Sequence, residues 1–301
     1  MNDSVPSRQT IGRVLESLDP MQLSYWLNFW RYTYLKKDDL EHIAIDGKED
    51  NACGFECMRA YDVKNGIVIA HQPVKKGMNE ITAAPLLLNK LDLRNVIVSG
   101  DAIITQKKIA HLIVIKGGDY LLALKRNHGQ LYEDVKLYLE TIEQSADLKG
   151  TFKKHTTAEK SHGRIETRVT ITTDKIGWLT QRYQWKNLKS LSMITRTRVS
   201  KNKTEMEQCL FISTLDADPV KISTAVRAHW LIENLCHRDL DMNFDSDGSL
   251  SRSGNAPFNI AILKDFVLGL LHQVDSDIPI KEKRLDNAYS LSTLLKTLLN
   301  R

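Results

Sequence analysis

Two short apolar segments of this chain each run directly into an aspartate that has a glycine beside it. Ile43–Ile45 is followed by Asp46 and Gly47, and Val96–Val98 is followed within three residues by Gly100 and Asp101. Apolar runs of this length, bounded by glycine, are typical of buried strands. We therefore predict that each aspartate stands at the C-terminal tip of a strand, where a glycine lets backbone or ligand approach closely.

The residues around these two segments alternate between strand and helix patterns. Strands are predicted at 57–63 and 67–74 with a turn at 64–66, then a helix at 79–91, a strand at 95–101, a helix at 105–116, a strand at 120–125 and a helix at 129–142. Three strands with a hairpin, followed by helix–strand alternation, indicate a mixed sheet flanked by helices in the ribonuclease-H-like order. In that order the first and fourth strands are parallel neighbours, and the two aspartates would face each other.

The remaining segments complete a predicted four-part organisation. Residues 11–35 have helical spacing interrupted at Asp19-Pro20 and form a helical N-terminal part, 1–40. The first part of the core is 41–144. Alternating polar and apolar residues at 164–173, 191–199 and 205–212 predict a β-rich insertion over 145–215, placed before the last catalytic helix. Helical patterning returns at 218–244 and 256–273, so 216–301 would complete the core.

Composition excludes some protein classes. The longest apolar stretches, such as 261–271, are too short to span a bilayer, and Met1–Thr10 has no apolar core, so we expect no secretory signal and no membrane contact. The four cysteines have neither disulfide-framework nor zinc-ribbon spacing and are predicted to be free thiols in the cytoplasm. The net charge of +5 is compatible with an acidic partner but carries little weight alone.

A third acid is expected from the late helices. Helical spacing places His229, Glu233 and His237 on one stripe, with Glu233 among apolar neighbours, where an unpaired carboxylate is costly. Two aspartates and this glutamate would suit Mg²⁺ or Mn²⁺, which favour oxygen ligands, and in-line phosphoryl transfer. Three alternatives stay open: Asp46 as a turn former, Glu233 as an ion-pair partner of Arg227 or His237, and the histidine stripe as a zinc site.

Six sequence blocks carry a resemblance to a known family. They are Ala44–Lys48, Asn79–Ala83, Gly118–Lys125, His162–Arg168, His229–Asn234 and Gly254–Pro257. In order and approximate spacing, the chain resembles the H-repeat-associated (ISAs-type) insertion-sequence DDE transposases from about Pro6 to its C-terminal helix. It departs from the family's usual pattern after Gly47-Lys48 and after Asp101-Ala102, and the helical region that usually precedes its PSRQT-like segment is largely missing.

The resemblance implies a DNA transposase that cleaves DNA and transfers strands, acting as a homo-oligomer on the ends of its element and on target DNA. Asp46, Asp101 and Glu233 match the family's catalytic, metal-binding acids, and His229 and His237 are supporting residues. The alternatives are a truncated, inactive copy that only binds DNA and a ribonuclease-H-like nuclease. A cytoplasmic protein that associates with the nucleoid when it binds DNA is expected. Candidate DNA contacts, with a solvated strand face as the alternative reading, are Lys125, Arg126, Arg164, Arg168, Arg196 and Arg198.

Overall fold

A computed structural model describes residues 6–34, 41–50, 55–145, 148, 150–161, 164–201, 203–244 and 252–299. The described residues group into two compact units. The first comprises those within 1–41, 45–90 and 231–301, and the second those within 42–44 and 91–230. The assignment of the chain changes from one unit to the other at the start of the first strand, inside that strand, after Lys90 and after Trp230. The four-part division predicted above stays a prediction.

The first unit contains the strand order β3-β2-β1 and seven α-helices in the part of the chain that the structure describes. Its strands are β1 (His42–Asp50, from Ile45 onward), β2 (Phe55–Asp62) and β3 (Ile67–Val74). Strands β2 and β3 are antiparallel, and Gly66 in their turn has a positive φ of 67°, which glycine adopts without strain. The predicted hairpin is therefore confirmed.

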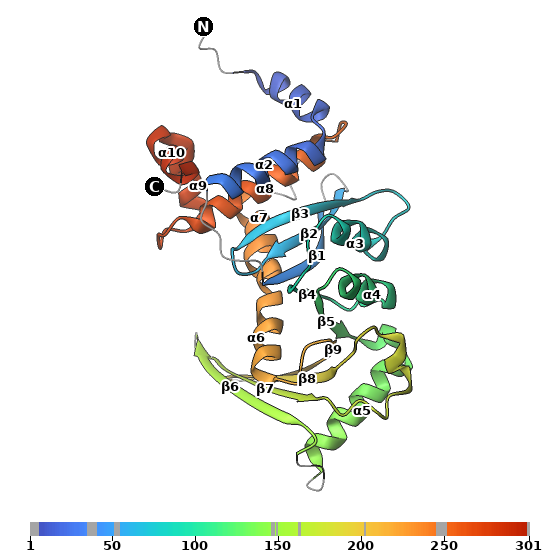
Figure 1. The fold of residues 1–301 in the computed structure, drawn as a ribbon. Coiled ribbons are helices and arrows are strands. Elements are labelled where there is room, and N and C mark those ends of the chain that lie inside the picture. Colours follow the sequence, from blue (N-terminus) through green and yellow to red (C-terminus); the bar gives the residue numbers. More distant parts are fainter. Residues whose placement is uncertain are drawn as a thin grey trace. The chain divides into compact units, whose positions relative to one another are not determined.

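The helices of the first unit include the two N-terminal helices that Asp19-Pro20 separates. They are α1 (Arg8–Ser17), α2 (Pro20–Tyr34), α3 (Glu80–Asn89), α7 (Arg238–Phe244), α8 (Ala256–Gln273), α9 (Ile280–Tyr289) and α10 (Leu291–Leu299), with a π-helical turn at Ile232–His237. Asn79 caps α3 through a reciprocal capping box with Thr82. Helices α2 and α8 lie side by side (Figure 1).

The core of the first unit includes a buried ionic cluster as well as apolar contacts. Phe258 and Ile262 of α8 pack with Cys57 of β2, against Leu23 and Leu27 of α2. Beside this layer, the Asp265 carboxylate of α8 accepts hydrogen bonds from Arg59 Nε and His71 Nε2, both at 2.8 Å. Burial alone would raise the pKa of Asp265, but the charge of Arg59 and the His71 bond lower it below its usual range.

The second unit is built on a large mixed sheet with the order β4-β5-β9-β8-β7-β6, next to the start of β1. Strands β4 and β5 are parallel, and every pair from β5 to β6 is antiparallel. The strands are β4 (Ile97–Gly100), β5 (Asp119–Leu124), β6 (Lys153–Ser161), β7 (Arg164–Thr173), β8 (Ser190–Ser200) and β9 (Lys203–Ser213). The predicted α/β class with a mixed sheet and helices is thus confirmed.

Three α-helices pack on this sheet within the described residues: α4 (Lys107–Ile115), α5 (Gln130–Gln144) and α6 (Pro219–His229). Short 3₁₀ helices occupy Arg126–His128 and Thr180–Gln184. Helix α6 lies against β7 and β8 (Figure 1), and its Val226 belongs to the same apolar core as Ile194 of β8. Its N-terminus is capped by Asp218, whose carboxylate accepts from the N–H groups of Val220 and Lys221.

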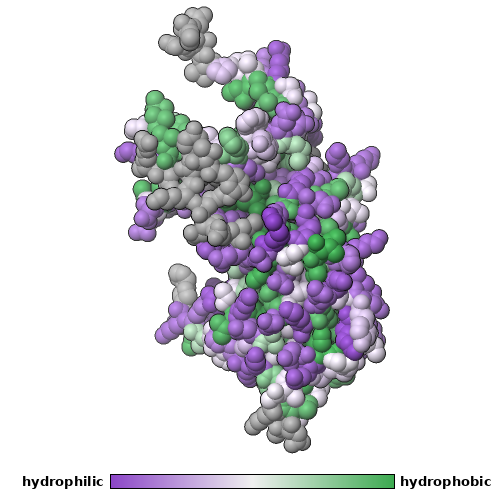
Figure 2. Space-filling view, viewed as in Figure 1, coloured by the Kyte–Doolittle hydropathy of each residue, from purple (hydrophilic) through white to green (hydrophobic). Residues whose placement is uncertain are grey.

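The surface is mixed in character. On the face seen in Figure 2 hydrophilic side chains predominate, with hydrophobic patches between them, one of which lies on α1. None of the helices in the described ranges has the length and apolar character that a bilayer crossing requires. Cys57, Cys209 and Cys236 are free thiols, as predicted, and Cys53 lies outside the described residues.

Candidate active site and basic surface

Asp46 lies in the first unit, in the middle of β1. The prediction that it stands at the tip of its strand is wrong, because the backbone stays extended through Gly47 and β1 continues to Asp50. Its Oδ1 accepts a hydrogen bond from the Gly47 N–H at 3.0 Å. His237 Nδ1 lies 3.5 Å from Asp46 Oδ2, so protonation of this histidine would create an ion pair. The carboxylate is 20% exposed, which leaves it accessible to a hydrated ion.

The residues that follow Asp46 explain why the sequence has glycine there. A Cβ on Gly47 would collide with the carboxylate of Glu80, the first residue of α3. Lys48, one residue further, forms an ion pair of 2.5 Å with Asp241 of α7. Sequence reasoning treated Glu80 only as a helix N-terminal residue. In the structure the Glu80 carboxylate lies against Gly47, the residue that follows Asp46 in the sequence.

Glu233 lies in the π-helical turn at Ile232–His237, where the backbone N–H of Arg238 donates to the Glu233 carbonyl five residues earlier. Such π turns often occur at functional sites. The expected stripe at regular α-helical spacing is wrong, because α6 ends at His229 and a π turn follows. The expectation that apolar neighbours bury Glu233 is also wrong, since its side chain is exposed.

The basic partners suggested for Glu233 have other carboxylate neighbours. Arg227 donates from its guanidinium Nη1 to Glu159 Oε1 at 2.5 Å. His237 faces Asp46, as described above. The ion-pair role considered for Glu233 therefore receives no support from either residue. An exposed carboxylate at the start of a π turn is instead free to meet a ligand from solvent.

Asp101 lies in the second unit, directly after β4, as predicted from the apolar run that precedes it. Its Oδ1 accepts from the backbone N–H of Ile103 at 2.9 Å, and its carbonyl accepts from the Thr105 hydroxyl at 2.9 Å. These bonds fix the loop after β4 and orient one carboxylate oxygen. The side chain is partly exposed, so Asp101 can also meet a hydrated cation.

Two histidines and a serine lie close to Asp101 in the second unit. His42 Nε2 is 2.7 Å from Ser99 Oγ, and Ser99 Oγ is 2.9 Å from His229 Nδ1. Burial lowers the pKa of His42 to about 4, and the neighbouring His229 adds to this effect. Burial lowers the pKa of His229 to about 4 as well, although the Asp101 carboxylate opposes the shift. Both rings are therefore neutral at physiological pH.

The three predicted acids are divided between the units, with Asp46 and Glu233 in the first and Asp101 in the second. Considering the described ranges alone, no three His, Cys, Asp or Glu side chains are grouped so as to hold a metal ion. The donors nevertheless fit Mg²⁺ or Mn²⁺ in their chemistry, since all three are carboxylates that solvent reaches. Neither histidine of the predicted zinc stripe stands beside a cysteine ligand pair in the sequence.

The candidate DNA contacts fall into two groups, both in the second unit. Lys125, Arg126 and Arg164 are exposed, the first two at the 3₁₀ turn after β5 and the third at the start of β7. Arg168, Arg196 and Arg198 form a ladder across β7 and β8, and each has a glutamate partner. Arg168 pairs with Glu159 and Glu166, Arg196 with Glu207, and Arg198 with Glu166.

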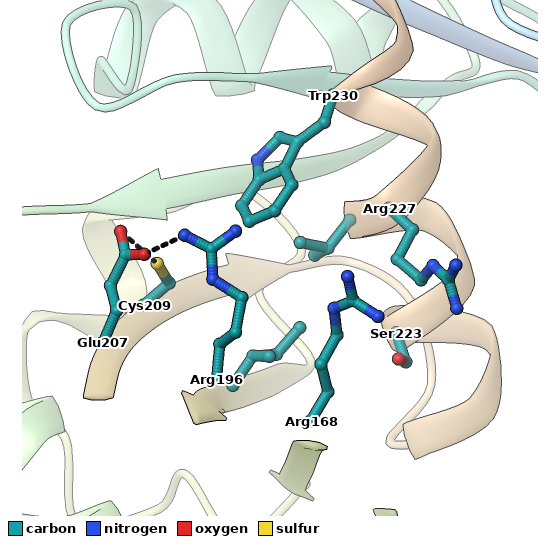
Figure 3. A pocket seen from close by; sticks show the side chains of 9 residues that line it. Arg168, Arg196, Glu207, Cys209, Ser223, Arg227 and Trp230 are labelled. Atoms are coloured by element: carbon teal, nitrogen blue, oxygen red, sulfur yellow. Dashed lines mark hydrogen bonds and ion pairs between the residues drawn. The ribbon is translucent and has the colours of Figure 1, made fainter. Parts of the chain in front are cut away.

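Arg168 and Arg196 border a pocket between the sheet and α6 (Figure 3). Arg168 and Arg196 extend toward this pocket, and the Arg196 guanidinium lies 4.6 Å from the centre of the Trp230 ring. Burial alone would raise the pKa of Glu166, but the Arg198 hydrogen bond and the nearby arginine charges lower it. The ladder is thus an ionised, internally neutralised network. The sequence nominated Arg196 and Arg198 as DNA contacts but gave no sign of their acidic partners.

Comparison with known proteins identifies the class. The family described as Transposase DDE domain matches residues 37–263, more than half of the chain, and the chain belongs to this family. It is 33% identical to a "Putative transposase YncI" of Escherichia coli O157:H7, over 97% of this chain and 77% of the relative. It is 31% identical to an "H repeat-associated putative transposase YhhI" of Escherichia coli K12, over 89% of this chain and 74% of the relative.

A third relative is described as an "Uncharacterized protein in dhlA 3'region" of Xanthobacter autotrophicus. It is 36% identical over 72% of this chain and 75% of its own length. The resemblance to the H-repeat-associated transposases that the sequence blocks indicated is therefore confirmed. All three predicted acids fall within the matched residues.

Proposed function

We propose that this protein is a metal-dependent DNA transposase that cleaves DNA at the ends of an insertion sequence and joins those ends to target DNA. Asp46, Asp101 and Glu233 are the proposed catalytic acids. The observation that carries the proposal is the match to the Transposase DDE domain family over residues 37–263, a range that includes all three acids. The proposal also covers double-stranded DNA as the substrate and a homo-oligomer as the acting form.

Several structural features support this proposal. The strand order β3-β2-β1 in the first unit and the start of β1 next to β4 and β5 in the second are the orders expected of a ribonuclease-H-like core. Asp101 directly follows β4, and Glu233 lies in a π turn. The antiparallel strands β6 to β9 follow α5 and precede α6 in the chain.

In the proposed mechanism the three carboxylates would supply the oxygen ligands for Mg²⁺ or Mn²⁺. A bound divalent ion neutralises charge on the attacking and leaving oxygens of an in-line phosphoryl transfer. The chain itself orients the acids: the Gly47 N–H holds Asp46, with His237 beside it, and the Ile103 N–H holds Asp101. The Ile103 N–H uses only Oδ1 of Asp101, so Oδ2 of Asp101 can meet a cation.

DNA is expected to bind through the phosphate backbone. Lys125, Arg126 and Arg164 are exposed cations that can reach phosphates directly. Arg168, Arg196 and Arg198 would have to exchange their glutamate partners for phosphate oxygens. Binding through this surface should weaken steeply as salt rises, because each phosphate contact releases counterions. A flat salt response would remove these residues from the proposal.

The test is cleavage of terminal-repeat DNA in Mg²⁺ or Mn²⁺, comparing wild type with Asp101→Asn. The Asn side chain keeps an Oδ1 that can accept from the Ile103 N–H, so the loop should persist while the charge is lost. We expect a loss of more than about 100-fold, beyond what a residue that only supports a metal ligand would cause. Asp216→Asn is the matched control. The Asp216 side chain is 91% exposed, so this variant should cleave DNA as the wild type does.

Each outcome has a defined meaning. Equal cleavage by wild type and Asp101→Asn would refute the assignment of the catalytic acids. Specific binding of terminal-repeat DNA by wild type without cleavage in either metal would favour the DNA-binding alternative. Cleavage of RNA in an RNA–DNA hybrid, but not of terminal-repeat DNA, would favour the nuclease alternative.

A further inference from the structure

The outward face of helix α2, in the first unit, is apolar and aromatic. On its inner side, Leu23 and Leu27 pack against the buried cluster of Cys57, Phe258 and Ile262. On the opposite side, four side chains that helical spacing brings together are 47–64% exposed: Met21, Tyr25, Trp26 and Phe29. The Trp26 ring contacts those of Tyr25 and Phe29 edge to face, at centroid distances of 5.4 and 5.9 Å. A helix that is apolar on both sides is typical of a buried element, so we expect a partner on the outward side.

Two neighbouring helices of the same unit also have apolar stripes that solvent reaches. Helices α1 and α10 are both amphipathic, yet neither contains a buried side chain. Both contact α8, and Leu298 of α10 shares an apolar cluster with Trp30 of α2. Figure 2 shows hydrophobic surface over α1 and over α10. Their exposed apolar side chains are 37–72% accessible: Ile11, Val14, Leu291, Leu294, Leu295 and Leu299.

The exposed apolar area is as large as that of a protein interface. A large side chain such as an aromatic one presents about 150–250 Å², so the four on α2 leave roughly 500 Å² in contact with water. The six aliphatic side chains of α1 and α10 add a comparable area, for a total of roughly 1,000 Å². The largest apolar patch of a monomer is usually about 300–600 Å², whereas each partner of a standard interface contributes about 800 Å². The area therefore suffices for a stable dimer.

The chemistry of this face argues against nucleic acid as the partner. From Pro20 to Trp30 the sequence contains no Asp, Glu, Lys or Arg. Lys90 lies at one edge, where its ammonium donates to the His71 carbonyl at 2.6 Å and lies 3.5 Å from Met21 Sδ. DNA binding needs cations at the phosphates, and surfaces that stack single-stranded bases are also positively charged. An uncharged face rich in aromatic rings instead matches the core of a protein–protein interface.

A second copy of this chain carries the same face and is complementary to it. An isologous interface places the same patch of two subunits against each other, so a face without charges meets no like charge in its copy. We propose that the outward face of α2, together with the apolar stripes of α1 and α10, is the interface of a homodimer. The dimer forms without DNA, and its role as the acting form in DNA cleavage rests on the proposed function.

The oligomeric state is measured on the whole chain without DNA, by sedimentation velocity over a concentration series. We expect wild type to show a reversible monomer–dimer equilibrium. Trp26→Glu and Phe29→Glu each place a charge in the interface and should raise the dimer dissociation constant at least about 30-fold, as residues that dominate an interface do. Leu137→Glu is the matched control, because Leu137 is a 68% exposed apolar residue on α5 of the second unit. It should leave the dissociation constant unchanged.

Tyr25→Ser is an uncharged probe of the same face. Tyr25 is 64% exposed, so this variant should fold as wild type does, which circular dichroism checks for all the variants. Loss of the ring should weaken the dimer by more than about 5-fold. The proposal can thus be tested even if a glutamate variant unfolds.

A wild type that stays monomeric throughout the series would overturn the proposal, as would a dimer that all three variants of α2 leave unchanged. Indefinite association would also overturn it, because an isologous interface closes after two copies. A monomeric wild type that cosediments with phosphatidylcholine vesicles would reassign the face to a lipid surface and overturn the homodimer. A wild type that dimerises but does not cleave terminal-repeat DNA would refute the proposed function and leave the dimer standing.

Discussion

Replacement of Asp265 by Asn should strongly destabilise the first unit. The Asp265 side chain is 0% exposed and accepts from Arg59 and His71, whose side chains are 6% and 5% exposed. Asn keeps the size of the side chain but removes the charge that neutralises the buried Arg59 guanidinium. Breaking a buried ion pair on one side costs about 3–5 kcal/mol. Against a total stability of about 5–15 kcal/mol for a typical protein, this loss is large.

The assay is urea unfolding at pH 7, followed by circular dichroism, with Asp275→Asn as the matched control. Asp275 is an exposed aspartate of the same unit and should change the free energy of unfolding by less than about 0.5 kcal/mol. If Asp265→Asn costs no more than this control, the ionic cluster contributes nothing net to stability and the reasoning is refuted.

The same variant should also alter the dependence of stability on pH. The pKa of Asp265 is lowered in the folded protein, so its ionised form is favoured by folding. This contribution is complete above the unfolded pKa of about 4 and is lost as the pH falls through the folded value. Wild type should therefore lose stability in acid more steeply than Asp265→Asn. Parallel curves for the two proteins would contradict the ionised state of the carboxylate.

Two further substitutions test the surroundings of the proposed site. Gly47→Ala should displace the Glu80 side chain and change the free energy of unfolding by less than about 1 kcal/mol, because the colliding group is the end of a flexible side chain. DNA cleavage should nevertheless fall if the acids around Asp46 must keep their places. Normal cleavage with normal stability would show that the Glu80 contact is dispensable. Glu207→Gln should tighten DNA binding by freeing Arg196, whereas Arg196→Ala should weaken binding and reduce by about 1 the slope of log binding constant against log salt concentration. Fluorescence anisotropy across a salt series measures both the affinity and this slope. Identical slopes in the two variants would exclude Arg196 as a phosphate contact.

The sequence predicted best those elements whose side chains have a clear apolar period. The bounds of β7 and α8 agree with their prediction to the residue, since one alternates and the other has a long apolar face. Strand β6 was missed because its residues, Lys153–Ser161, are almost all polar. Strand β6 is an edge strand of the sheet, and an edge strand that pairs with one neighbour alone does not need an apolar face.

The identity of the catalytic acids stays a prediction, and their local structure was only partly predictable from the sequence. The acids could be nominated because apolar runs and family blocks mark their positions. The sequence did not predict that Asp46 lies in the middle of β1, because the second half of this strand is polar and a strand is not expected to continue through Gly47-Lys48. Hydrogen bonds between distant segments, such as His42 with Ser99, depend on strand neighbours and leave no local pattern.

The π turn at Ile232–His237 also determines how the first unit responds to changes in chain length. Each residue of an α-helix advances its rotation by about 100°, so a deletion within the turn would rotate all of α7 by roughly that angle. Asp239, which lies 3.3 Å from His272, and Asp241, which pairs with Lys48, would both turn away from their partners. Point substitutions leave this rotation intact. In this segment, therefore, the number of residues is under stronger constraint than the identity of most of them.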